Sequence, residues 1–359
     1  MEKLSRIVRE LVEIEGAACA GIATVETLAG GPPSADLTYV LPGARAAVSF
    51  AVAIDRRRIP PYLAKQDRLA FEREYVKVNV LASGIALHLA AFLSQKGFPS
   101  VPVAANNVFR PPASGSDPHR TDELYYPDLA HRYLAVRSGV GHLGLSGNLI
   151  HPEHGAAVIL AATVTTAPLV PTPPLPEADN YCDACRLCMA SCVAGFMDPR
   201  EATVVSLGGR PFTYSRRRRY GRCDPVCSGF TGLHASGKWS TWSPGRFPVP
   251  ERADELQPAF ERMREAHGRR PSAPGGRRFF FTDQKLRVSC ANCQLVCCPD
   301  RKERLARYRM LTRSGVVVQH PDGRLEAVRP EAARAYLAAL PRDVRALYTE
   351  ETDPCETES

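Results

Sequence analysis

The chain has 359 residues, with 46 Lys and Arg against 38 Asp and Glu, and its formal net charge is +8. Its 44% hydrophobic and 23% charged residues are typical of a globular protein and exclude a disordered chain, a collagen-like repeat and a coiled coil. No run approaches the ~18 consecutive apolar residues that a membrane-spanning helix needs, so we expect a soluble protein without a membrane partner. The charged, amphipathic first residues are unlike a secretion signal and favour the cytoplasm.

The first half of the chain alternates helical and strand patterns and predicts one α/β or α+β unit. The main signals are a buried strand that ends at Asp55 and a long amphipathic helix that Gly97 stops. In chain order, the patterns predict a helix over 4–12, a strand over 46–54, a helix over 67–96, a strand over 101–104, a helix over 128–137 and a strand over 156–164.

A proline-rich connector over 168–176 precedes a segment, 182–298, that has many cysteines, glycines and arginines but little periodicity. We expect that segment to gain its order from what its cysteines bind. A hairpin over 316–328 and a helix over 331–340 form a small appendage before an acidic tail. The fold class predicted is α+β, with units at 1–180, 181–305 and 306–359.

The cysteines are concentrated in the middle unit. Ten of the twelve lie between Cys182 and Cys298, and only Cys19 and Cys355 lie outside. A disulfide framework would be spread through the fold that it staples. We therefore interpret the cysteines as metal ligands in a reducing compartment.

The cysteine spacing favours iron–sulfur clusters over zinc. The first group reads Cys182-x2-Cys185-x2-Cys188-x3-Cys192, and the second reads Cys290-x2-Cys293-x3-Cys297. In two-cluster ferredoxins three cysteines of such a run bind one [4Fe-4S] cluster and the fourth binds the other. A single zinc ion would leave two cysteines of the first group without a role.

Two such clusters need eight ligands, and the spacing supplies seven. Cys223 and Cys227 lie between the groups and are the candidates for the eighth. Cys298 is an alternative to Cys297, and the sequence does not rank the two.

These groups, with Cys293-Gln-Leu-Val-Cys297 in the second, resemble the epoxyqueuosine reductases and the related reductive dehalogenases. The upstream segment from His131 to Gly144, with Arg132-x2-Ala-x3-Gly139-x-Gly141-x2-Gly144, is similar to the same family. The likeness covers residues 35 to 300.

The resemblance implies a cobalamin-dependent reductase that removes oxygen or halogen from its substrate. Its N-terminal domain would be nitroreductase-like and hold the cobalamin and the substrate, and its ferredoxin-like domain would hold two [4Fe-4S] clusters fed by an external one-electron donor of the flavodoxin or ferredoxin type. By the family's crossed pattern, one cluster, nearer the cobalamin or its partner, would use Cys182, Cys185, Cys188 and Cys297. The other would use Cys192, Cys290, Cys293 and either Cys223 or Cys227.

The glycine segment matches a dinucleotide-binding fingerprint, but a helical pattern precedes it where that fingerprint needs a strand. A tight loop that lets a large flat cofactor approach the backbone is the better interpretation. By resemblance, the cobalamin-site candidates are Gly139, Gly141, His142, Gly144, Ser146 and Asn148.

The sequence departs from the family at the proton donor. Epoxyqueuosine reductases carry an aspartate seven residues before the arginine that corresponds to Arg132, and this chain has Tyr125 there, followed by Tyr126. Reductive dehalogenases use tyrosine as the acid, so both tyrosines are catalytic candidates, against the alternative of an aromatic pair packed in the core.

An insertion between the cysteine groups holds Arg216 to Arg219 and both tryptophans, Trp239 and Trp242. We expect a wall over the cofactor from its aromatic rings, and the arginines either bind tRNA phosphates or form a solvated loop. Two rivals remain: an electron-transfer protein with clusters but no cobalamin, and a zinc-stabilised RNA-binding protein.

Overall fold

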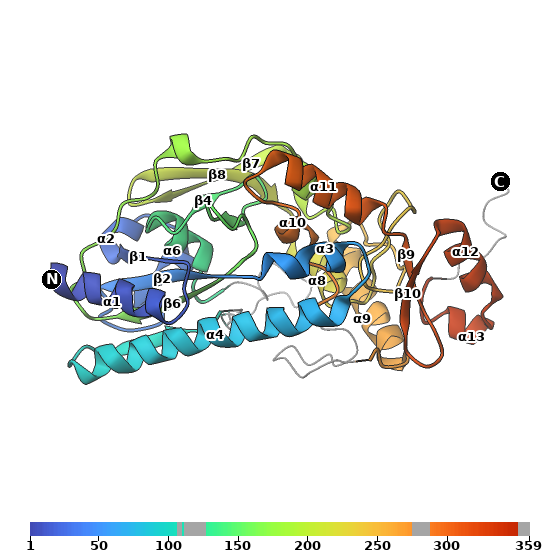
Figure 1. Ribbon diagram of the computed structural model, residues 1–359, viewed down its shortest axis with the longest axis horizontal. Coiled ribbons are helices and arrows are strands. Elements are labelled where there is room, and N and C mark those ends of the chain that lie inside the picture. The colour runs from blue at the N-terminus through green and yellow to red at the C-terminus, as the bar shows by residue number, and fades with distance from the viewer. Residues whose placement is uncertain (106–109, 111–126, 275–287, 351–359) are drawn as a thin grey trace.

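The computed structural model describes residues 1–105, 110, 127–274 and 288–350 (Figure 1). The strands are β1 (Cys19–Thr24), β2 (Ala46–Ala53), β3 (Ser100–Val103), β4 (His142–Leu143), β5 (Leu149–Ile150), β6 (Val158–Thr165), β7 (Met197–Leu207), β8 (Arg210–Arg217), β9 (Val316–Gln319) and β10 (Leu325–Val328). The helices are α1 (Glu2–Ile14), α2 (Val25–Leu28), α3 (Ile59–Leu63), α4 (Arg68–Gln95), α6 (His131–Arg137), α7 (Leu187–Ala190), α8 (Tyr220–Cys227), α9 (Ala253–Arg269), α10 (Asn292–Leu295), α11 (Arg301–Thr312), α12 (Pro330–Ala339) and α13 (Arg342–Arg345).

A four-stranded antiparallel sheet in the order β1-β2-β6-β3 is covered by helices on both faces. Strand β2 explains the helices on both faces, because both of its own faces are apolar. On one face, Val48 and Phe50 join a hydrophobic cluster with α1 and α4. Ala47 and Ala51 join a second cluster with α6. A strand that is apolar on both faces must be covered on both to bury its side chains.

Helix α4 is the long helix that runs beneath the sheet in Figure 1. Asp67 caps its start by accepting a hydrogen bond from the Ala70 N–H at 3.0 Å. Its length and composition alone would allow it to cross a membrane. It packs along β6 and β3, with Ile85 and Leu89 buried, which is the position of a core helix.

Every helix and strand predicted over residues 1–165 is present, but the prediction missed β1, an edge strand of the sheet, and the short α2, α3, β4 and β5. The C-terminal hairpin and helix are also confirmed, as β9, β10 and α12. The expectation of little regular structure between the cysteine groups is wrong, because β7, β8 and α9 lie there. The β7–β8 hairpin turns at Gly208 and Gly209, whose φ angles of +58° and +75° favour glycine.

Both tryptophans belong to the core, which corrects the expectation that they form a wall over a cofactor. Trp239 and Trp242 are 3% and 4% exposed and join the cluster that contains α1 and α4. The Trp242 indole N–H donates to the carbonyl oxygen of Tyr62 at 3.1 Å. Burial with a satisfied N–H is the usual position of a core tryptophan.

Candidate functional site

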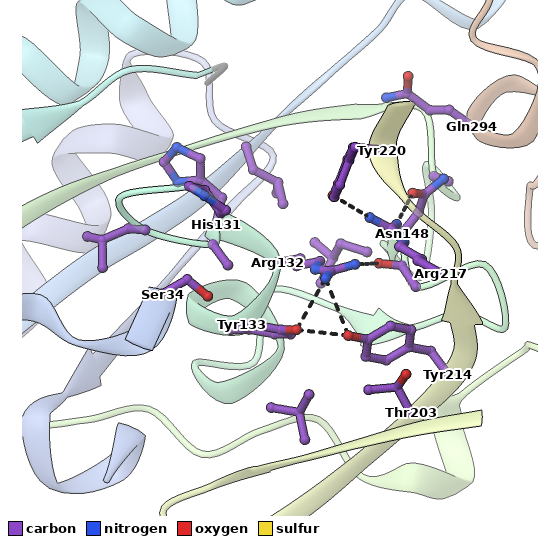
Figure 2. A pocket seen from close by; sticks show the side chains of 18 of the residues that line it. Ser34, His131, Arg132, Tyr133, Asn148, Thr203, Tyr214, Arg217, Tyr220 and Gln294 are labelled. Carbon is purple, nitrogen blue, oxygen red and sulfur yellow. Dashed lines mark hydrogen bonds between the residues drawn. The ribbon is translucent and has the colours of Figure 1, made fainter. Parts of the chain in front are cut away.

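A cavity of about 1,020 Å³ lies between the central sheet, the β7–β8 hairpin and the second cysteine group. Figure 2 shows side chains on its wall from several elements, among them Arg132 and Tyr133 of α6 and Tyr214 and Arg217 of β8. Another part of the same cavity is lined by Cys227, Cys290 and Cys293. One space is therefore bordered by arginines and phenols and by thiols.

Arg132 connects two tyrosines on the cavity wall. Its Nη2 donates to the hydroxyl of Tyr133 at 3.2 Å and to that of Tyr214 at 3.3 Å. The two hydroxyls are themselves 2.8 Å apart, and the Arg132 Nη1 donates to the Gly147 carbonyl at 3.2 Å. Burial raises the pKa of Tyr133 to about 12, so this phenol stays protonated at neutral pH.

Arg217 is held at the end of β8 by three hydrogen bonds. Its Nε donates to the Ser146 carbonyl at 3.1 Å, its Nη2 to the Asn148 side-chain oxygen at 2.8 Å and its Nη1 to the Tyr220 hydroxyl at 3.3 Å. Burial alone would raise the pKa of Tyr220, but the nearby Arg217 and Arg132 lower it below its ordinary value. Tyr220 is thus a more acidic phenol than Tyr133.

The first set of thiols, which lines a smaller void, consists of Cys182, Cys185, Cys188 and Cys297. The loop that carries the first three takes left-handed conformations at Ala184 and Arg186, which are non-glycine residues with φ angles of +51° and +58°. Three hydrogen-bonding groups approach these thiols: the Leu145 N–H reaches Cys182 at 3.3 Å, the Arg304 Nη1 reaches Cys185 at 3.5 Å and the Tyr181 hydroxyl lies 3.7 Å from the Cys297 sulfur.

A second set of thiols lies where the cysteine segments meet α8. Its members are Cys192, Cys223, Cys227, Cys290 and Cys293. Burial raises the pKa of Cys192, and the charges of Cys293, Cys223 and Cys290 raise it further. Burial likewise raises the pKa of Cys293 to about 12, with contributions from Cys290 and Cys223. The Phe196 N–H donates to the Cys192 sulfur at 3.4 Å, and the Asn148 amide donates to the Cys293 sulfur at 3.7 Å.

The two candidate cysteines of α8 both belong to this second set. Cys223 and Cys227 are one helical turn apart, so their thiols share a face, and their sulfurs are 3.3 Å apart. Cys298 points elsewhere: it is buried, and its thiol donates to the Asp300 carbonyl at 3.6 Å. The structure therefore places Cys297, and not Cys298, among the thiols of the first set.

The thiols lie at two places, and the assignment of each thiol to one of two clusters stays a prediction. The cavity borders Cys227, Cys290 and Cys293, which are thiols of the second set. The first set, expected nearer the cofactor, borders the smaller void. Among the residues that the structure describes, no three His, Cys, Asp or Glu side chains converge tightly enough to hold a single metal ion.

The cofactor candidates of the glycine segment are divided among three locations. Asn148 lines the large cavity, whereas Gly144 and Ser146 line the void of the first thiol set. Gly139 and Gly141 lie against protein backbone, because a Cβ added to them would come within 2.4 Å of the Pro173 carbonyl oxygen and 2.6 Å of the Ile150 carbonyl oxygen.

His142 is buried in β4, and burial lowers its pKa. Its role in cofactor binding, like those of the glycines, Ser146 and Asn148, stays a prediction. Tyr125 and Tyr126 lie outside the described residues.

Several of the cavity residues that sequence reasoning missed, Thr203 and Tyr214 among them, come from the β7–β8 hairpin. Tyr214 and Arg217 reach the cavity because β8 pairs with β7. The signal was available in the Gly208-Gly209 pair, which is flanked on both sides by residues typical of strands. The arginine run obscured this signal, because it suggested a loop.

No family model matches the chain. A curated epoxyqueuosine reductase from Synechococcus sp. (strain CC9605) is 38% identical over 64 residues, which are 18% of this chain and 19% of that protein. The matched segment is thus about a fifth of the relative's length.

Two solved structures resemble the chain at lower identity. A reductive dehalogenase is similar over 91% of this chain and 40% of its own, with a TM-score of 0.48 and 14% identity. An epoxyqueuosine reductase solved with an epoxyqueuosine-modified tRNA stem loop is similar over 95% of this chain and 74% of its own, with a TM-score of 0.41 and 17% identity. The partial match to curated epoxyqueuosine reductases agrees with the family that the motifs resemble.

Proposed function

We propose that the chain is an oxidoreductase of the epoxyqueuosine reductase type, with two [4Fe-4S] clusters and a cobalamin that lies in the large cavity. The observation that carries this proposal is the presence of two separate thiol sets, one of which borders the cavity. The curated relative named an epoxyqueuosine reductase supports the same class of reaction.

The residues of both sets suit iron–sulfur clusters. Each set offers at least four cysteine thiols, and N–H groups donate to their sulfurs from the backbone at Leu145 and Phe196 and from the side chains of Arg304 and Asn148. Hydrogen bonds to cluster sulfurs are among the factors that set a cluster's reduction potential. Electrons would pass from an external one-electron donor through the first set and then the second, because the second set borders the cavity.

Within the second set we assign Cys223 as the ligand and Cys227 as the spare thiol. Sulfurs 3.3 Å apart do not suit two corners of one cubic cluster, because each ligand continues outward from its own iron. Cys223 lies close enough to Cys192 and Cys293 to raise the pKa of both thiols, whereas Cys227 is crowded against both Cys223 and Cys290. We therefore expect Cys192, Cys223, Cys290 and Cys293 to hold the second cluster.

The cavity suits a large cofactor with a substrate above it. Its volume of about 1,020 Å³ is at the upper end for ligand sites, and the apolar residues Val158, Ile159 and Leu160 of β6 form part of its lining. Cobalamin, when bound there, supplies a low-potential cobalt centre for reductive removal of oxygen or halogen. Asn148 and the phenols of Tyr214 and Tyr220 border the same space and would orient substrate and hold protons.

Anaerobic reconstitution tests this proposal. The expected result is about eight iron and eight sulfide per chain, with added cobalamin bound in its base-off form. Serine at Cys223 should remove about half of the iron, while serine at Cys227 should leave the iron content unchanged. A colourless protein that holds only zinc would contradict the clusters, and intact clusters without cobalamin binding would leave an electron-transfer protein.

Turnover then identifies the substrate class. Epoxyqueuosine-containing tRNA and halogenated phenols are assayed in parallel with the reconstituted protein and a chemical one-electron donor. Conversion of the tRNA would establish epoxyqueuosine reduction, and conversion of the phenols alone would establish a dehalogenase. No conversion of either, with all cofactors bound, would contradict the proposed reaction.

A further inference from the structure

Among the residues that the structure describes, two guanidinium groups on the cavity wall have no carboxylate partner. Over the described ranges, neither Arg132 nor Arg217 forms an ion pair, although both are partly buried and each makes several hydrogen bonds. The neighbouring arginines are paired: Arg216 lies 3.1 Å from Asp198 and 2.8 Å from Glu201. Arg218 lies 3.7 Å from Asp198. The carboxylates of the hairpin therefore neutralise the arginines on either side of Arg217 but not Arg217 itself.

The same wall has more hydrogen-bond donors than acceptors. Tyr220 accepts from Arg217, so its own O–H has no acceptor among these contacts. Tyr133 and Tyr214 share one hydrogen bond between their hydroxyls, and Arg132 donates to both oxygens. One phenolic O–H of that pair is therefore left over as well.

Surplus donors and positive charge on a concave surface are what an oxyanion requires. Charge-assisted hydrogen bonds from guanidinium groups are stronger than neutral ones, and Arg is the usual residue for recognition of carboxylate and phosphate. Figure 2 shows Arg132, Arg217 and Tyr220 near one another on the cavity wall, and both arginines lower the pKa of Tyr220. Any group bound here would lie beside Asn148, which contacts the second thiol set.

We propose that Arg132, Arg217 and Tyr220 form an oxyanion-binding subsite of the cavity, which takes a carboxylate or phosphate group. The subsite rests on the proposed function only for the identity of the molecule that carries the group. That molecule is either the substrate or the cofactor, since cobalamin carries one phosphodiester. The binding itself follows from the charges and donors of this wall.

Equilibrium binding of benzoate and of inorganic phosphate to the cluster-loaded, cobalamin-free protein tests the subsite by calorimetry. We expect at least one of the two anions to bind, and Arg217→Gln to weaken that binding at least about ten-fold, because a hydrogen-bonded charge is lost. Arg216→Gln is the matched control: it removes the same charge one residue away, from an arginine that is already paired. Tyr220→Phe should weaken binding less than Arg217→Gln.

Repeating the titration with cobalamin bound distinguishes the two sources of the group. Retained anion binding assigns the subsite to the substrate, and lost binding assigns it to the cofactor's phosphodiester. In the second case, cobinamide, which lacks the phosphodiester, should leave anion binding intact. Absence of binding by either anion to the cobalamin-free protein, or equal losses in Arg217→Gln and Arg216→Gln, would overturn the proposal without affecting the proposed function, because neither outcome depends on clusters or turnover.

Discussion

The two thiol sets differ in what surrounds them. The first encloses a narrow void, and its thiols are approached by the Leu145 N–H, the Arg304 guanidinium and the Tyr181 hydroxyl. The second has one thiol more than a cluster needs and opens onto the large cavity. We infer that the first set relays electrons inside the protein and that the second delivers them to the cavity.

The largest effect expected concerns Cys297 and Cys298, adjacent residues of which only Cys297 belongs to the first set. Cys297→Ser should lower the iron content from about eight to about four per chain, because it removes a cluster ligand. Cys298→Ser should leave it unchanged, because Cys298 donates to the Asp300 carbonyl instead. Iron analysis and electron paramagnetic resonance of the reconstituted variants measure this difference. Equal iron loss in both variants would show that the two residues are not distinguished as the structure indicates.

A smaller effect is expected from Arg304, which ties α11 to the first set. Its Nη1 lies 2.9 Å from the Asp183 carboxylate and 3.5 Å from the Cys185 sulfur, and its side chain is 4% exposed. Arg304→Gln should lower the reduction potential of the first cluster and reduce the free energy of unfolding by about 1 kcal/mol, because the partly exposed Asp183 carboxylate loses its buried guanidinium partner.

Arg301→Gln is the control for Arg304. Arg301 also approaches Asp183, at 3.6 Å, but its side chain is 81% exposed, so its loss should cost less than about 0.5 kcal/mol. Redox titration and urea denaturation give the two quantities. A shift in the potential of the second cluster in place of the first would contradict the grouping.

The smallest effect expected is a pH dependence of anion binding at the cavity wall beside the second set. The arginines lower the pKa of Tyr220 below its ordinary value of 10, so its phenol loses its proton before that of Tyr133, whose pKa burial raises to about 12. Below its pKa, Tyr220 donates to a bound oxyanion; above it, the phenolate repels the anion. Anion affinity should therefore fall as the pH rises toward 10. Tyr220→Phe should flatten this dependence, and an unchanged profile in that variant would exclude Tyr220 as its source.

The grouping of the cysteines was predictable from the sequence only in part. Regular spacing identifies two groups, but it does not separate Cys297 from Cys298, because neighbouring residues point in different directions only once the chain is folded. The same holds for Cys223 and Cys227, which share one face of α8. Their 3.3 Å separation, which the sequence does not show, is the reason we propose only one of the two as a ligand.

The composition of the insertion was misleading in two ways. Trp239 and Trp242 suggested a cofactor wall, but the structure buries both in the core. The arginine run suggested either a phosphate-binding segment or a solvated loop, but pairing distinguishes its members: Arg216 is neutralised by Asp198 and Glu201, and Arg217 has no such partner among the described residues. Neither distinction is encoded locally, because each depends on segments that are distant in the sequence.

Asn148 joins the cavity wall to the second thiol set through one amide group. Its oxygen accepts from Arg217, and its nitrogen donates to the Cys293 sulfur. Movement of Arg217 toward an incoming anion would therefore change how strongly that amide donates to the sulfur. Because linkage between two sites is reciprocal, the redox state of the second cluster and the occupancy of the cavity would then influence each other through this single side chain.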